Sequence, residues 1–593
     1  FGAATPGAAR PAGRHVAYFH TLHALNSARI QPSTAAAFDA LAEFEKAAAA
    51  DVAPQAGAAE PQSSVMSLWA LLRSMIPKSG GQGATVQQLV TGARRHLEAG
   101  HATYMTDVVR KHAQVARLGG ETSNLARVHA FLRVSLKGQG QLDFDAPGSD
   151  GAMNTTWRQV YYCVRSGYMK EALQVANAAN DPSTRSAGII FADALKEWVD
   201  NDGCVSNATA SALSQHCKRM LAETGPRKND RNRVHLLVLY AIVARDARAA
   251  QDLVGQNPTF FSYIQDFMWF KLALVRQQPA AGDAFAAAPA SSSFQIQDLQ
   301  SYLRQFPSKH YSCDGRDPLM YVNVLLLSLQ FKAALQYLLY DPAAAAYRTD
   351  GVHMAVALEH YQVLSVEGLE ADQPDTAGLD LAQCIIRYGK EFAMDDPTTA
   401  LEYMAFAAAL APHFRAQELF AQLLQERGAA RHLLGEDGGA ARDRTPLARF
   451  VPDAAARREL LLATAAHCNA KAKYEEAIEL YMRAGGHAKA LELVNQQLGN
   501  HLSGLMANVE PSASALQRQG EAVRRDAATS AEGLAGRGGA ELAAQEDRFV
   551  MLLEVGRLFQ AAAEGNLPEA LRLVRGLQER RGGAPGGGAR ERG

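Results

Sequence analysis

The stretch WRQVYYCVRSGYMKEALQVANA, residues 157–178, decides the fold. In its first half, apolar side chains recur at i, i+3, i+4 and i+7, the spacing that lines one face of an amphipathic helix. Ser166 and Gly167 interrupt this spacing, which then resumes from Met169. A turn this short reverses the chain, so the stretch predicts two antiparallel helices packed as an αα-hairpin.

The second half of this hairpin recurs downstream as an apolar or turn residue followed by Ala-Leu or Ala-Ile at i+3 and i+4. Copies begin at Phe331, Pro397, Tyr474, His487 and Leu567. A small Ala lets the second helix approach the bulky side chains of the first. In an Ala-rich chain a single copy can arise by chance, so only the whole set indicates repeated hairpins. The uneven spacing excludes a strict tetratricopeptide period and favours an irregular helical solenoid.

The repeated positions supply a set of expected hairpin contacts, in which each side chain packs one helix against its neighbour. These residues are Trp157, Tyr161, Ala172, Leu173, Ala334, Leu335, Ala400, Leu401, Ala477, Ile478, Ala490, Leu491, Ala570 and Leu571. The sequence does not indicate which residues bind partners.

Composition agrees with an all-α fold. The chain has 593 residues, is rich in Ala and Leu, and has almost no alternating apolar and polar segment long enough for a strand. The ambiguous run at Tyr321–Leu329 leads into the Phe331 copy and is interpreted as a buried helix. A chain of this length could form several globular domains, but the recurring hairpins favour one repeat stack.

Charge and cysteine content exclude several classes of protein. The formal net charge is −1, so the chain offers no basic field for nucleic acid. Its longest apolar run is far below the roughly 18 residues that span a bilayer, and no transmembrane segment is expected. The six cysteines form no C-x-x-C pair, which suits free thiols in a reducing compartment better than disulfides or zinc.

Motifs for catalysis or cofactor binding are missing from the sequence. Residues 79–85 (SGGQGAT) lack the Gly-Lys-Ser/Thr of a phosphate-binding loop, and no Gly-x-Ser-x-Gly elbow occurs. The pairs His20/His23 and His353/His360 do not form a zinc-binding H-E-x-x-H motif. We therefore expect no catalytic residues, no metal site and no cofactor. The aromatic side chains of residues 263–270 are spaced as a helix core rather than as a binding stripe.

The predicted organisation is one elongated helical solenoid over residues 14–578, after a flexible lead-in at 1–13 and before a disordered tail at 579–593. Low-complexity inserts are expected near residues 51–64, 277–293, 435–445 and 508–540, where apolar periodicity is lost. The chain opens at Phe1 rather than at a methionine, and we expect it to be part of a longer protein.

The central hairpin resembles the signature hairpin of the nucleoporin-interacting-component family of scaffold nucleoporins. Further segments resemble that family in the same order along the chain. They are HVAYFHTLHALNSAR (15–29), DPLMYVNVLLLSLQFKAALQYL (317–338), RYGKEFAMDDPTTALEYMAF (387–406), KYEEAIELYMRAGGHAKALELVNQQL (473–498) and FVMLLEVGRLFQAAAEGNLPEALRLV (549–574). Ordered matches over most of the chain are more specific than any one of them.

The resemblance implies an α-solenoid of the ancestral coatomer type that folds back on itself, in a structural component of the nuclear pore inner ring at the nuclear envelope. In the family, the solenoid binds a short motif of a linker nucleoporin. An amino-terminal helical extension recruits the channel nucleoporin trimer and a large solenoid nucleoporin. That extension is not seen in this sequence, so its partners cannot be assigned to these residues.

Two other classes of function compete with the pore scaffold. Vesicle-coat and tethering solenoids are the alternative, because coatomer-type folds share the same hairpins. An all-helical enzyme is the third hypothesis, and it is disfavoured because no paired acid and base or metal constellation is found. The position of a tagged protein in the cell separates the first two.

Overall fold

The computed structural model describes residues 12–31, 38–50, 64–77, 84–145, 151–179, 185–186, 189–201, 203–222, 231–275, 294–366, 369, 379–410, 415–435, 443–504, 513–529 and 537–582. The expected insert at 277–293 and most of the expected lead-in, of the linker at 51–64, of the insert at 435–445 and of the tail lie outside these residues. Helix α1 already begins at Ala12, two residues before the predicted start of the solenoid.

Contacts divide the chain into two compact units, residues 1–379 and 380–593. That the two continue as one solenoid stays a prediction. The helices of unit 1 are α1 (Ala12–Ile30), α3 (Ala40–Ala49), α4 (Val65–Met75), α5 (Val86–Lys111), α6 (Ala113–Ala116), α7 (Asn124–Ser135), α8 (Thr156–Arg165), α9 (Met169–Ala178), α10 (Phe191–Asp200), α11 (Asn207–Ala222), α12 (Arg231–Ala244), α13 (Ala247–Gln256), α14 (Ile264–Leu274), α15 (Ile296–Leu303), α16 (Ser308–Tyr311), α17 (Pro318–Leu327), α18 (Phe331–Tyr340) and α19 (Arg348–His360), with 3-10 turns η4 (Pro342–Tyr347) and η5 (Val363–Ser365).

The described strands of unit 1 are short. Strands β1 (Arg185–Ser186) and β2 (Ile189–Ile190) form a two-residue antiparallel pair just before α10, where the sequence predicts helix. The all-α class is confirmed, with this small pair as a local exception.

The central hairpin forms as predicted. Helices α8 and α9 pack against each other, and the turn between them runs through Ser166 and Gly167. Gly167 has φ +77°, a left-handed conformation that costs glycine least, which explains the choice of residue at this reversal. Helix α5 begins with a capping box: the Thr85 hydroxyl accepts from Gln88 N–H, and the Gln88 side chain accepts from Thr85 N–H.

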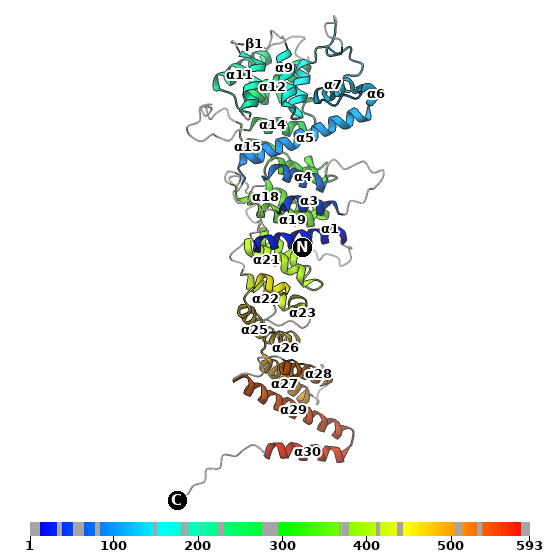
Figure 1. The fold of residues 1–593 in the computed structure, drawn as a ribbon, viewed down its shortest axis with the longest axis vertical. Helices are drawn as coiled ribbons and strands as arrows, with labels where there is room; N and C mark the ends of the chain where they lie inside the picture. Colours follow the sequence, from blue (N-terminus) through cyan, green and yellow to red (C-terminus); the bar gives the residue numbers. More distant parts are fainter. Residues whose placement is uncertain are drawn as a thin grey trace. The chain divides into compact units, whose positions relative to one another are not determined.

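Unit 1 folds back on itself. Its early helices pack against helices that come more than a hundred residues later in the chain: α3 against α19, α4 against α17, and α5 against α14. Figure 1 shows α3, α4, α18 and α19 side by side in this part of the molecule. The fold-back that the family resemblance implies is therefore confirmed within unit 1.

A buried polar cluster joins the two ends of this fold-back, and we call it the clasp; it consists of Tyr18, Asp350, Trp69 and Arg14. The Tyr18 hydroxyl of α1 donates to Asp350 Oδ1 of α19 at 2.7 Å, and Trp69 Nε1–H of α4 donates to the Tyr18 oxygen at 3.1 Å. Arg14 pairs with the same carboxylate at 3.2 Å. The Tyr18 ring stacks on His353 with centroids 4.1 Å apart. The clasp therefore satisfies polar groups that burial would otherwise penalise.

Unit 2 is a second series of helices. They are α20 (Leu381–Lys390), α21 (Pro397–Leu410), α22 (Ala416–Leu424), α23 (Ala429–Leu434), α24 (Pro446–Phe450), α25 (Ala454–Ala470), α26 (Tyr474–Arg483), α27 (His487–Gly504), α28 (Ala513–Thr529), α29 (Arg537–Ala563) and α30 (Leu567–Gly582). Successive helices pack as hairpins: α20 with α21, α25 with α26, and α29 with α30.

The prediction of a low-complexity insert at 508–540 is wrong for the residues of this range that the structure describes. Residues 513–529 form α28, which packs against α27 and buries Leu516, Val523 and Ala527. Gly520 lies directly under the Phe549 ring of α29, where a Cβ atom would overlap the ring carbons. The buried residues Leu516, Gly520, Val523 and Ala527 recur at i, i+4, i+7 and i+11, but only two of them are large apolar residues, so the helical period is weak in the sequence.

Two helix boundaries also differ from the sequence prediction. The run at 321–329, interpreted as a buried helix, is helical only to Leu327, and a break at Leu329, with φ +60°, separates α17 from α18. The expected disordered tail begins too early, since α30 continues to Gly582. At the start of that helix, Asn566 accepts from Glu569 N–H at 3.3 Å and acts as a capping residue.

Candidate partner-binding surfaces

The expected hairpin contacts lie mainly in the interior. Leu173 is half-buried, and Leu571 is 60% exposed, which contradicts the contact expected there. Helix α30 packs chiefly against α29, and this packing leaves most of the Leu571 side chain exposed. The remaining positions are buried: Trp157, Tyr161, Ala172, Ala334, Leu335, Ala400, Leu401, Ala477, Ile478, Ala490, Leu491 and Ala570.

Tyr161 shows what the central hairpin holds together. Its ring lies edge-on to His235 of α12, to Phe260, and to Trp269 of α14, with centroids 4.9, 5.4 and 5.8 Å away. Burial raises the pKa of its hydroxyl well above the usual value. Tyr161 therefore belongs to the core that joins α8, α12 and α14, and it is not available to a ligand.

Other buried ionisable groups are also explained by packing between helices. Glu98 of α5 accepts from Trp269 Nε1–H at 3.3 Å and pairs with Arg94 at 3.3 Å. Burial raises the pKa of Glu98 despite these partners. Within the described ranges, no three His, Cys, Asp or Glu side chains are grouped to hold a metal ion.

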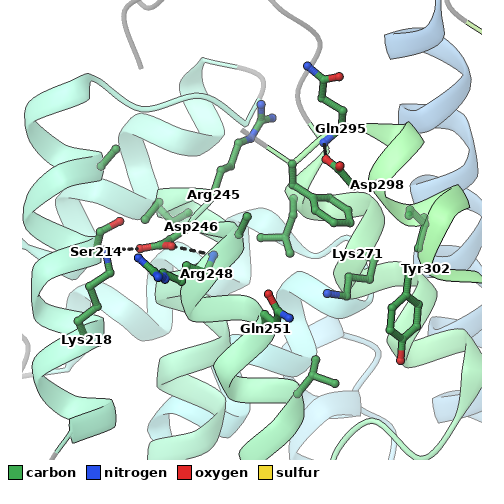
Figure 2. A pocket seen from close by; sticks show the side chains of 18 of the residues that line it. Ser214, Lys218, Arg245, Asp246, Arg248, Gln251, Lys271, Gln295, Asp298 and Tyr302 are labelled. Carbon is green, nitrogen blue, oxygen red and sulfur yellow. Dashed lines mark hydrogen bonds and ion pairs between the residues drawn. The ribbon is translucent and has the colours of Figure 1, made fainter. Parts of the chain in front are cut away.

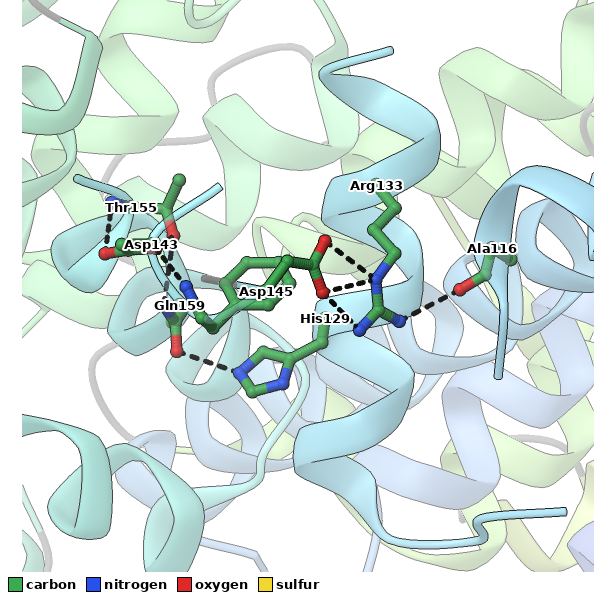
Figure 3. Close-up of polar contacts among 8 residues, drawn as sticks. Ala116, His129, Arg133, Asp143, Asp145, Thr155 and Gln159 are labelled. Atoms are coloured by element: carbon green, nitrogen blue, oxygen red, sulfur yellow. Dashed lines mark hydrogen bonds and ion pairs between the residues drawn. The ribbon is translucent and has the colours of Figure 1, made fainter. Parts of the chain in front are cut away.

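The loop between α7 and α8 is fastened by a polar network (Figure 3). Arg133 donates to both carboxylate oxygens of Asp145, at 2.7 to 3.1 Å, and to the Ala116 carbonyl at 3.0 Å. His129 Nε2 lies 3.0 Å from the Gln159 amide oxygen, and burial lowers the pKa of this histidine. These partners hold the loop on the helices, so the network is structural.

A cavity of about 1230 Å³ opens in unit 1 between α11, α13, α14 and α15 (Figure 2). Its basic side chains are Lys218, Arg245, Arg248 and Lys271, and its acidic side chains are Asp246 and Asp298. This site was not predicted from the sequence, because its walls come from several helices whose packing no local pattern shows. The available signal was Lys271, a lone charge inside the apolar run FMWFKLAL.

Exposed aromatic side chains form a second candidate surface. Tyr104 of α5 is 58% exposed and Tyr263, at the start of α14, is 71% exposed, although the sequence assigns Tyr263 to a helix core. The two helices that carry them pack against each other. Partial burial, with Tyr263 and Asp266, raises the pKa of Tyr104. Tyr104 and Tyr263 therefore offer exposed aromatic surface next to the contact between α5 and α14.

No helix in the described ranges has both the length and the apolar character needed to cross a membrane. This agrees with the sequence, in which no long apolar run occurs. The candidate surfaces therefore belong to a helical stack with aromatic and cationic side chains at its surface.

Comparison with known proteins identifies the family. The family model described as Nup93/Nic96 matches residues 57–578. The nuclear pore complex protein NUP93A of Arabidopsis thaliana is 33% identical over 469 residues, which cover 74% of this chain and 53% of that protein. Nuclear pore complex protein Nup93 of Xenopus laevis is 24% identical over 89% of this chain and 63% of its own length. The chain spans about half the length of the Arabidopsis relatives.

A solved structure agrees with the fold. The crystal structure of Chaetomium thermophilum Nic96 SOL superposes with a TM-score of 0.64 over 95% of this chain and 86% of that one, at 16% sequence identity. At this identity the match concerns the fold alone, and it supports the solenoid class. Because the family model covers most of the sequence and the helical fold agrees, the chain belongs to the Nup93/Nic96 family.

Proposed function

We propose that this chain is a structural scaffold nucleoporin of the nuclear pore complex inner ring, where it supports pore assembly and nucleocytoplasmic transport by docking other nucleoporins. The match of the Nup93/Nic96 family model to residues 57–578 carries this proposal. The vesicle-coat or tethering alternative is not favoured, because the Arabidopsis and Xenopus relatives are named as nuclear pore complex proteins.

The long-range contacts within unit 1 are those expected of a rigid scaffold protein. Its fold-back is secured by the Tyr18–Asp350 clasp and by the contact between Glu98 and Trp269, both of which join helices distant in sequence. Such contacts make the helices of unit 1 unfold together rather than one hairpin at a time. No enzymatic role is proposed, because the buried ionisable groups described above form hydrogen bonds and ion pairs that hold helices together.

The proposed docking partner is a short motif of a linker nucleoporin, which would lie on the exposed aromatic pair Tyr104 and Tyr263. An extended peptide gains affinity by placing a few apolar anchors on such a surface. The chain has a net charge of −1, so it offers little long-range steering, and affinity should depend weakly on salt.

The first experiment follows a fluorescently tagged chain in cells. A perinuclear ring supports the scaffold proposal, and cytoplasmic puncta support the vesicle-coat alternative. The second experiment titrates the purified chain with a linker-nucleoporin peptide. Tyr104→Ala and Tyr263→Ala should each weaken binding several-fold, whereas Tyr340→Ala, which removes an exposed tyrosine of α18, should leave it unchanged. No binding, or steep salt dependence, would reject this docking mode.

A further inference from the structure

The side chain of Lys271 is largely buried between helices, and its ammonium group lies at the wall of the cavity. Lys271 lies on α14 and is only 9% exposed. Its Nζ lies 5.6 Å from the Phe267 ring centroid and 5.2 Å from that of Phe294, and among the described residues it forms no hydrogen bond or ion pair. Burial lowers its pKa, as expected for a cation held away from water. Figure 2 shows the side chain pointing into the cavity between the helices.

The carboxylates around this cavity do not neutralise Lys271, because both are used to cap helices. Asp246 accepts from the backbone N–H groups of Arg248 and Ala249, at 3.1 and 3.0 Å, and pairs with Lys218 at 3.4 Å. These interactions outweigh burial and lower the pKa of Asp246.

At the opposite wall, Asp298 accepts from Gln295 N–H at 2.7 Å at the start of α15. The lining therefore carries four cationic side chains and two carboxylates, and both carboxylates already accept hydrogen bonds from backbone N–H groups. The N-terminal ends of α13 and α15 also line the cavity, but Asp246 and Asp298 cap them, so the excess positive charge of the lining comes from its side chains. The cavity is suited to a negatively charged group.

An aromatic ridge leads from Lys271 to the surface. Phe267 contacts Tyr302, Tyr302 contacts Phe306, and Phe306 stacks on His310, with ring centroids 5.4, 5.8 and 4.9 Å apart. Tyr302 lines the cavity and is 39% exposed, and Phe306 is 37% exposed. A ligand that placed an acidic group at Lys271 would thus continue along an apolar surface.

We propose that this cavity binds a short acidic segment of a protein partner, with a carboxylate beside Lys271 and a neighbouring apolar side chain against Tyr302 and Phe306. A peptide fits better than a free anion, because the aromatic ridge has no role in binding a small ion. The proposal rests on the proposed function in that both treat the chain as a docking scaffold. It concerns a different surface, with the opposite dependence on salt.

The test uses two sets of fluorescein-labelled Gly/Ser-rich peptides. One set carries two glutamates and one phenylalanine at varied separation, and the other carries glutamine in place of glutamate. Anisotropy titrations of the full chain should detect binding of the acidic set only, with affinity falling as salt rises. Failure of every acidic peptide to bind, or equal binding of the glutamine set, would overturn the proposal.

Variants assign the binding to the cavity. Lys271→Met keeps the apolar stem and should weaken the best acidic peptide about ten-fold, whereas Lys271→Arg should restore most of the affinity. Arg248→Gln, at an exposed position of the cavity rim, should weaken binding several-fold. Lys196→Met removes an exposed lysine of α10 and is the matched control, with no change expected. Equal affinities for Lys271→Met and Lys196→Met would place the peptide elsewhere.

Two further measurements separate the possible failures. If Lys271→Met lowers the melting temperature strongly, Arg248→Gln and Lys271→Arg carry the test instead. Complete displacement of the acidic peptide by inorganic phosphate, at an ionic strength where sodium chloride does not displace it, would make the cavity a general anion site and overturn the peptide proposal. The linker peptide is titrated in parallel: its binding to Lys271→Met tests the Tyr104 surface, so one proposal can fail while the other stands.

Discussion

Tyr18 and Asp350 are joined by a 2.7 Å hydrogen bond although 332 residues separate them in the chain. Both side chains are buried, and the bond fixes the first described helix of unit 1 against α19. Burial, followed by the charge of Asp350, raises the pKa of the Tyr18 hydroxyl far above its usual value, so this group stays a donor at all physiological pH. This contact adds to the packing of α3 on α19, of α4 on α17 and of α5 on α14 in holding the fold-back of unit 1.

Replacing Tyr18 with Phe should destabilise unit 1 by about 1 to 3 kcal/mol, because the substitution leaves Asp350 with one donor fewer and Trp69 Nε1–H without its acceptor. Chemical denaturation followed by tryptophan fluorescence measures the loss. Tyr340→Phe removes the hydroxyl of an exposed tyrosine and is the control. Equal stability of the two variants would mean that the clasp contributes nothing.

Mild acid should destabilise unit 1 through its buried histidines. Burial lowers the pKa of His353 to about 3, and burial together with Arg165 lowers that of His101 to about 3. Both are neutral in the folded chain at pH 6, whereas the unfolded chain gains protons below about pH 6.5. Above that pH these two groups leave the free energy of unfolding unchanged. As the pH drops further, each histidine lowers the free energy of unfolding by about 1.4 kcal/mol per pH unit.

Denaturation at pH values from about 7.5 to 5.5 tests this dependence. Burial raises the pKa values of Asp350 and Glu98. Protonation of these carboxyl groups in acid favours the folded chain and would mask the effect of the histidines, so a pH below this range is not used. His353→Gln should reduce the slope, and His20→Gln, at an exposed position of α1, should not. A stability that is flat across this range contradicts the buried neutral state.

The packing of α28 is tested at Gly520. Substitution by Ala places a methyl group into the Phe549 ring, so α28 and α29 must separate, at a cost of about 1 to 3 kcal/mol. Gly499 of α27 has open space around it, and Gly499→Ala should be neutral or stabilising through helix propensity. Similar melting temperatures for the two variants would support a loosely attached insert instead of a packed helix.

The repeated Ala-Leu motif should differ in energetic importance from copy to copy. Leu401 of α21 is fully buried, and Leu401→Ala should cost about 2 to 5 kcal/mol. Leu571 occupies the same motif position in α30 but is 60% exposed, so Leu571→Ala should change stability by less than about 0.5 kcal/mol. A large effect at Leu571 would show that a contact covers it in solution.

The local part of this fold could be predicted from the sequence. The spacing of Trp157, Tyr161 and Ala172 indicated two helices and a reversal, and these are present with the residues buried. Such patterns reflect neighbours three and four residues apart, which one sequence contains directly. Helix α28 was missed because its buried residues Leu516 and Val523 are isolated among polar and small residues.

The long-range part could not be predicted. Nothing in the residues around Arg14 indicates that Asp350 is its partner, because no local pattern encodes a contact across more than three hundred residues. The cavity was missed because its walls lie on five successive helices between residues 204 and 305, and no local pattern shows how these helices pack. Family resemblance supplied the fold-back as an expectation, but not the residues that hold it.

The most direct test of the proposed scaffold role is photobleaching of the tagged chain at the nuclear envelope, in cells depleted of the endogenous relative. A scaffold docked through several surfaces should exchange slowly, so the account predicts a perinuclear ring that recovers little over hours. Recovery within seconds, or fluorescence that stays away from the nuclear rim, would contradict it.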